Sequence, residues 1–148
     1  MTDILTTIQK GWGWSGIEPV EVVAVSPVGN VIVLDASGIV WRICPEELSA
    51  ERIAHSMSAF EALRDAPEFV EDWEMGAFGR EAERALGPPG DGRCYCLKIP
   101  AVLGGQYARE NLGVISIAEL LGASGSMAFQ IKDIPDGQRV RLVVQKPD

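Results

Sequence analysis

Three short runs rich in β-branched residues, separated by turn sequences, constrain the fold of this chain more than any other feature. The runs are VEVVAVS, VIVLDA and VWRIC, and PVGN and SG stand between them. Valine and isoleucine favour strands, whereas glycine, proline and asparagine favour tight turns. Consecutive runs with such short connections therefore predict an antiparallel meander over residues 20–44.

Helical patterns come before and after the predicted meander. Apolar side chains recur at helical spacing in residues 3–10, which predicts a short opening helix. Ser58 is placed to cap a helix over residues 59–66, and residues 67–86 predict a longer amphipathic helix that packs on the sheet. Residues 115–134 predict one or two more helices, with a break at one of the glycines.

Two further strands complete the predicted architecture. The breaker GPPGDG at residues 87–92 precedes the strand CYCLKIP at 94–100, and RVRLVV at 139–144 alternates as a final strand does. The predicted fold class is α+β, with a mostly antiparallel sheet of about five strands and helices packed on one side. Residues 1–148 are expected to form one domain with an N-terminal lobe 1–86 and a C-terminal lobe 93–146.

The length of the chain and its cysteine content limit the class of protein. A chain of 148 residues with 47% hydrophobic residues suits one compact domain. Three cysteines are an odd number, and the N-terminus has no export-signal pattern, so we expect reduced thiols in a bacterial-type cytoplasm. Apolar runs stay far below the roughly 18 to 20 residues that cross a bilayer, which argues against a membrane protein.

Acidic residues are concentrated in the first half of the chain. Residues 1–74 hold 13 acidic and 4 basic residues, a balance of −9, whereas residues 75–148 hold 8 acidic and 9 basic, a balance of +1. Such a surface repels nucleic acid and attracts a basic protein. The alternative is that these acids form the solvated faces of ordinary helices.

Cys94 and Cys96 are the residues that most directly suggest a metal or redox site. A zinc site needs about four ligands, and the chain offers beyond this pair a single further cysteine, Cys44, and one histidine, His55. On a strand, residues two apart share a face with Cα atoms roughly 6.5 to 7 Å apart, which is at the limit for a disulfide. The pair is therefore predicted to be buried in the core, with no metal or cofactor.

The glycine loop that follows, LGGQY at 103–107, lacks the spacing of a phosphate-binding loop or of a dinucleotide fingerprint. Adjacent glycines favour a turn with positive φ or a close backbone approach. Tyr107 either packs its ring or contacts a partner, and a small-ligand pocket near Gly104–Tyr107 is an alternative function. No nucleophile or metalloenzyme motif surrounds His55, so we expect no enzymatic activity.

Two of the four tryptophans stand close together in GWGWSG. Trp12 and Trp14 either form an exposed aromatic patch for a partner or cover an open end of the meander.

Several segments together resemble a known bacterial family. These are residues 93–144, WRICPEELS at 41–49 and FVEDWE at 69–74. They are similar to the C-terminal domain of type VI secretion immunity proteins that protect against DNase effectors. GWGWSG is similar to the end of the GAD-like domain that precedes this domain in two-domain immunity proteins, and we expect that preceding part to be truncated here.

The resemblance implies a cytoplasmic, non-enzymatic protein that binds and neutralises a cognate nuclease toxin. The alternatives are a small-ligand-binding protein or small enzyme that uses the pocket near Gly104–Tyr107, and a stand-alone regulatory relative with no toxin partner. A DNase must be basic to hold DNA, so an acidic inhibitor can cover its DNA-binding face through complementary charge. The candidate contact residues are the acidic Glu46, Glu47, Glu68, Glu71, Asp72 and Glu74, with Trp12, Trp14 and Tyr107 as aromatic anchors.

Overall fold

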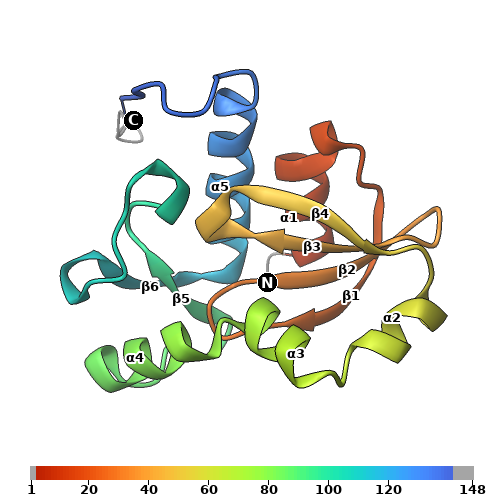
Figure 1. Cartoon of the computed structure of the whole chain (residues 1–148), viewed down its shortest axis with the longest axis horizontal. Coiled ribbons are helices and arrows are strands. Elements are labelled where there is room, and N and C mark those ends of the chain that lie inside the picture. The colour runs from red at the N-terminus through yellow and green to blue at the C-terminus, as the bar shows by residue number, and fades with distance from the viewer. Residues whose placement is uncertain (1–2, 142–148) are drawn as a thin grey trace.

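The computed structural model of the protein describes residues 3–141, which form two antiparallel sheets and five α-helices (Figure 1). The strands are β1 Pro19–Val25, β2 Val31–Asp35, β3 Val40–Cys44, β4 Ser49–Ala54, β5 Arg93–Leu97 and β6 Leu112–Ser116. The helices are α1 Ile4–Trp12, α2 Met57–Leu63, α3 Pro67–Glu74, α4 Gly76–Leu86 and α5 Ile117–Ile131. The predicted α+β class and single-domain arrangement are confirmed.

The first sheet contains the predicted meander, with strand order β1-β2-β3-β4 and every pair antiparallel. Asp35 closes the turn between β2 and β3, because one carboxylate oxygen accepts hydrogen bonds from the N–H groups of Ser37 and Ile39 at 2.8 and 3.0 Å. Its other oxygen accepts from the indole N–H of Trp41 at 2.7 Å. The buried carboxylate of Asp35 therefore both closes the turn and holds Trp41 in the core.

Two strands, β4 and β6, were not predicted from the sequence. After the short 3-10 helix Pro45–Glu47, Leu48 takes a left-handed backbone with φ 49°, which turns the chain back so that β4 pairs with β3. The strand β6 pairs with β5 and takes the first residues of the predicted helix at 115–134. That helix begins only at Ile117, because the hydroxyl of Ser116 accepts a hydrogen bond from the N–H of Glu119 at 3.0 Å.

Helices pack on both faces of the four-stranded sheet, which corrects the prediction of helices on one side. On β2, Val31 and Val33 point into a cluster formed with residues of α1 and α5. Ile32, between them, points to the opposite face and packs with Phe60 of α2 and Trp73 of α3. Side chains alternate along a strand, so a strand with four apolar residues in a row, such as β2, requires cover on both faces.

The amphipathic helix predicted over residues 67–86 is broken at Met75. This residue has φ 51° and ψ 51°, which ends α3 and lets α4 leave in a new direction. The helix α4 then packs against the second sheet, where Phe78 joins a buried cluster with Tyr95 and Leu112. Because of this break, α3 packs on the four-stranded sheet and α4 packs on the sheet of β5 and β6.

The helices α1 and α5 lie side by side with almost no space between their backbones. A Cβ atom on Gly125 would lie 2.3 Å from the carbonyl oxygen of Gly11, closer than real Cβ contacts. The indole N–H of Trp12 donates to the carbonyl oxygen of Leu121 at 3.0 Å. The helix α5 runs through Gly122 and Gly125 without the predicted break, since Gly125 serves a close helix contact instead.

Two smaller predictions also differ from the structure. Ser56 caps α2, in place of the predicted Ser58, by accepting a hydrogen bond from the N–H of Ala59 at 3.0 Å. In the strand predicted at 139–144, residues 139–141 have no strand pairing, and the remaining positions lie outside the described residues.

Candidate functional site

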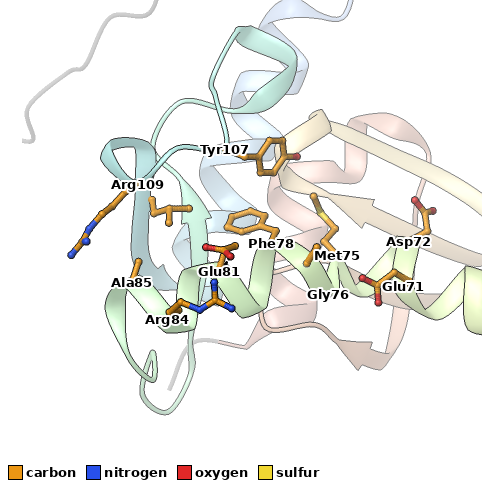
Figure 2. A pocket seen from close by; sticks show the side chains of 12 residues that line it. Glu71, Asp72, Met75, Gly76, Phe78, Glu81, Arg84, Ala85, Tyr107 and Arg109 are labelled. Carbon is orange, nitrogen blue, oxygen red and sulfur yellow. Dashed lines mark hydrogen bonds and ion pairs between the residues drawn. The ribbon is translucent and has the colours of Figure 1, made fainter.

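A groove of about 770 Å³ runs between α4 and the segment that joins β5 to β6 (Figure 2). This volume falls within the roughly 300–1,000 Å³ of ligand pockets in proteins. One wall comes from the end of α3 and from α4, and the other comes from residues 107–112. The lining residues are Glu71, Asp72, Met75, Gly76, Ala77, Phe78, Glu81, Arg84, Ala85, Tyr107, Arg109 and Leu112.

An aromatic pair forms the middle of the groove. The rings of Phe78 and Tyr107 meet edge to face, with centroids 5.2 Å apart and an interplanar angle of 83°. Phe78 is buried in the core beneath, whereas Tyr107 is 54% exposed. Burial, with negative charge at Glu46 as a smaller cause, raises the pKa of the Tyr107 hydroxyl. Tyr107 therefore offers a neutral ring and a hydroxyl that can both donate and accept hydrogen bonds.

Ion pairs surround this apolar middle. Asp72 accepts a hydrogen bond from Arg42 at 2.8 Å, and the two side chains differ greatly in exposure, 73% for Asp72 and 14% for Arg42. Glu71 pairs with Arg80 at 3.1 Å, where both partners are exposed. Exposed pairs contribute little to stability and rearrange easily, so these carboxylates remain accessible to a charged partner.

The far end of the groove carries arginines. Arg84 pairs with Glu81 at 2.6 Å. Arg109 is exposed, and within residues 3–141 it makes no ion pair. Figure 2 shows both arginines at the end opposite Glu71 and Asp72. The groove therefore has carboxylates toward α3 and guanidinium groups toward the β5–β6 connection.

The groove brings together three of the residues predicted from the sequence as partner contacts, namely Glu71, Asp72 and Tyr107. Glu68 and Glu74 lie on the same helix α3, the first exposed and the second half-buried. Five of the nine predicted residues thus belong to one side of the molecule.

The other predicted residues do not lie in the groove. Glu47 is exposed on the turn before β4. Trp14 is 40% exposed and lies over α1 and α5. Its ring stacks on that of Trp12 with the centroids 5.9 Å apart and meets the ring of Phe129 edge to face with the centroids 5.8 Å apart. Trp12 is fully buried and cannot contact a partner, because it fills the core between the first sheet and α5.

Glu46 also has to be removed from the predicted contact surface. Its side chain is 2% exposed, and its carboxylate oxygen Oε2 has no hydrogen-bond partner among residues 3–141. Burial raises the pKa of Glu46 to about 7, although backbone hydrogen bonds at Glu46 and Leu97 lower it in part. Glu46 and Glu47 are neighbours in sequence, yet the first is a core residue and the second a surface residue.

The cysteine pair on β5 is buried, as predicted. Cys94 and Cys96 pack with Leu120 of α5, and both are free thiols. Burial raises the pKa of Cys94 to about 12 and that of Cys44 to about 11. Among residues 3–141, no group of three or more His, Cys, Asp and Glu side chains is arranged to hold a metal ion.

The glycine loop near Tyr107 has the two backbone features that adjacent glycines favour. Gly104 has φ 93° and ends a short 3-10 helix. A Cβ atom on Gly105 would lie 1.8 Å from the carbonyl oxygen of Ile99. Asn111 fixes the same loop, because its side chain donates to the carbonyl oxygens of Ile99 and Gln106 at 3.0 Å each. The loop is therefore a rigid support for Tyr107.

The described helices include none that is long and apolar enough to span a membrane. Residues 54–128 match the family described as "T6SS immunity protein Tdi1, C-terminal". The chain belongs to this family. The matched residues of this immunity-protein family include all of α2, α3, α4, β5 and β6, and hence every residue that lines the groove.

Comparison with solved structures is evidence for the fold and not for the function. A crystal structure of Atu4351 from Agrobacterium tumefaciens is similar, with a TM-score of 0.54 and 13% sequence identity. The similarity covers 83% of this chain and 62% of that chain, so the immunity-family chain spans less than two thirds of the length of that protein. No curated protein matches the sequence.

Sequence reasoning missed the residues that make the groove what it is. Phe78, Arg84 and Ala85 lie in the helix that the sequence predicted over residues 67–86, and Arg109 belongs to none of the predicted elements. The helical period predicts which residues share a face. It does not predict that residues 107–112, more than twenty positions away, lie opposite that face.

Proposed function

We propose that this protein binds and neutralises a toxin of its own type VI secretion system, in the cytoplasm and without catalysis. The observation that carries the proposal is the family match over residues 54–128. Immunity proteins act by binding, and the matched region contains a groove with an aromatic middle and charged ends, a composition typical of protein contact sites.

We further propose that the toxin is a basic nuclease. The helix α3 carries Glu68, Glu71, Asp72 and Glu74 and has no basic residue of its own. Such a surface repels DNA and accelerates the approach of a protein whose own surface is basic. Complementary charge would allow the immunity protein to cover the DNA-binding face of the toxin.

A small ligand in the groove is the second candidate function. Its support is the volume of about 770 Å³ together with the apolar floor at Phe78 and Tyr107. A thermal-shift screen with nucleotides, flavins and divalent metals separates this candidate from toxin binding. Stabilisation by one of these ligands at micromolar concentration, with no toxin binding, would favour it.

The toxin proposal is tested by co-expression with the product of the neighbouring gene, measuring cell survival and the dissociation constant of the purified pair. Survival with a tight complex is expected. A variant with Glu47, Glu68, Glu71 and Asp72 changed to Lys should lose both. The matched control changes four exposed acids elsewhere to Lys, namely Glu18, Glu21, Asp91 and Asp136.

The two variants carry the same change in net charge at different places on the surface. Binding lost in the first and kept in the second supports the acidic face. Equal binding by both variants would show that the acidic face is not where the toxin docks.

A further inference from the structure

We infer that the groove holds a single segment of the partner protein in one orientation. This segment carries a Lys or Arg side chain at the α3 end, a bulky apolar side chain in the middle and a hydrogen-bond acceptor at the Arg109 end. The inference rests on the proposed toxin-binding function and adds to it the chemistry of the segment that is bound.

The middle of the groove fits an apolar anchor. Phe78 and Tyr107 present an edge-to-face aromatic surface, and Met75 and Leu112 extend it along the groove. Figure 2 shows Tyr107 above Phe78, with the ring of Tyr107 on the opposite wall. Such a half-exposed ring over a buried one is a favourable site for an aliphatic or aromatic side chain, because both partners lose apolar surface to water.

The α3 end fits a cation. Asp72 holds the largely buried Arg42 beneath it, while its own carboxylate is 73% exposed and points to solvent. Glu71 stands beside it with its side chain 57% exposed, and its partner Arg80 is itself exposed. An arriving Lys or Arg can therefore bind Asp72 without displacing Arg42, since a carboxylate accepts several hydrogen bonds.

The opposite end fits an acceptor. Arg109 is exposed and has no ion pair among residues 3–141, whereas Arg84 is already held by Glu81. A guanidinium group offers five N–H donors, so Arg109 is suited to a carboxylate or to backbone carbonyl groups of the bound segment.

The length of the α4 wall agrees with one short segment of chain. From Gly76 to Arg84 the helix α4 rises by about 12 Å. About four residues of extended chain cover this distance. A short partner segment can thus lie along the α4 wall beside Phe78.

The test uses a random peptide display library selected against the immobilised native protein. Ala77 is exposed in the groove, so Ala77→Arg places a long, positively charged side chain in it. Ala62→Arg makes the same substitution at an exposed position of α2 outside the groove. Selected peptides should share a basic residue next to a bulky apolar one, and should bind the Ala77→Arg variant at least about tenfold more weakly.

A second variant tests the orientation. Arg109→Glu should shift the selected peptides toward a basic residue at both ends, whereas Arg139→Glu, an equal change outside the groove, should leave the selection unchanged. The inference is overturned if no such peptides are enriched, or if they bind the Ala77→Arg variant as well as the native protein.

The toxin then separates this inference from the proposed function. A selected peptide that competes with the toxin supports both. A toxin that binds the native protein and the Ala77→Arg variant equally well overturns the groove as its docking site and leaves immunity intact. If the neighbouring gene product does not bind the native protein, the proposed function fails, and the peptide selection still decides whether the groove has this specificity.

Discussion

Two pairs of facing elements differ in how closely they approach each other. The first pair is α1 with α5, and the second is α4 with residues 107–112. Between α1 and α5 the backbones touch at Gly11 and Gly125, and the indole of Trp12 fills the space beneath. Between α4 and residues 107–112 the side chains of Phe78 and Tyr107 hold the walls apart.

Side-chain size at the contact decides how closely the backbones of two elements approach each other. Glycine lets the backbones come into direct contact, and large rings prevent this. Substitutions at the contact between α1 and α5 should therefore destabilise the fold. Substitutions between α4 and residues 107–112 should leave the fold intact and change binding.

The largest expected effect is at the closed pair. Gly125→Ala places a methyl group 2.3 Å from the carbonyl oxygen of Gly11, so the helices must separate, and the free energy of unfolding should fall by about 3 kcal/mol. Gly122→Ala on the same helix meets only Thr7 at 3.8 Å and should stabilise α5 by about 0.5 kcal/mol or more. Urea unfolding of the two variants measures the contrast, and equal stabilities would refute the close contact.

Glu46, which lines a cavity with residues of α5, β5 and β6, should make stability depend on pH. Its pKa of about 7 in the folded chain lies above the ordinary value of 4.5, so the native state binds the proton more tightly than the unfolded state. This contribution is present below pH 4.5 and is lost as the pH rises to 7. From pH 5 to pH 8 the loss should be about 2 to 3 kcal/mol.

The Glu46→Gln variant should lose this part of the pH dependence, while Glu47→Gln, at the exposed neighbour, should retain it. Urea unfolding of native and variant proteins at several pH values provides the comparison. Parallel pH profiles for the native protein and Glu46→Gln would show that Glu46 is not the group responsible.

A smaller effect is expected at the ion pairs of the groove. Asp72→Ala deprives the largely buried Arg42 of its carboxylate and should lower the free energy of unfolding by about 1 kcal/mol. Glu81→Ala breaks a pair whose members are both exposed and should change stability by less than about 0.5 kcal/mol. Chemical denaturation distinguishes the two, and a larger loss for Glu81→Ala would contradict the assignment.

A small effect on stability should also come from the exposed ring of the groove. Tyr107→Ala removes the edge-to-face contact with Phe78, and the free energy of unfolding should fall by only about 0.5 kcal/mol. Toxin affinity should fall far more than stability, which calorimetry on the purified pair can measure. Large destabilisation with unchanged affinity would make Tyr107 a structural residue and would favour the packing alternative.

Much of the fold could be predicted from local patterns. The meander, the opening helix and the burial of Cys94 and Cys96 follow from propensity, turn residues and alternation. The strands β4 and β6 could not be predicted so, because SAERIA and LGVIS are weak strand formers that pair only where a neighbouring strand offers its edge. The helical periodicity of residues 67–86 likewise does not predict the break at Met75.

For the site, residue identity and near neighbours are enough to predict the family, the acidic character of α3 and the presence of Tyr107 on a glycine-supported loop. Three features emerge only when the chain has folded: Glu46 is buried while Glu47 is exposed, Trp12 is a core residue, and Phe78 faces Tyr107. Burial and facing contacts arise from chain segments far apart in sequence, and no local pattern encodes the approach of such segments.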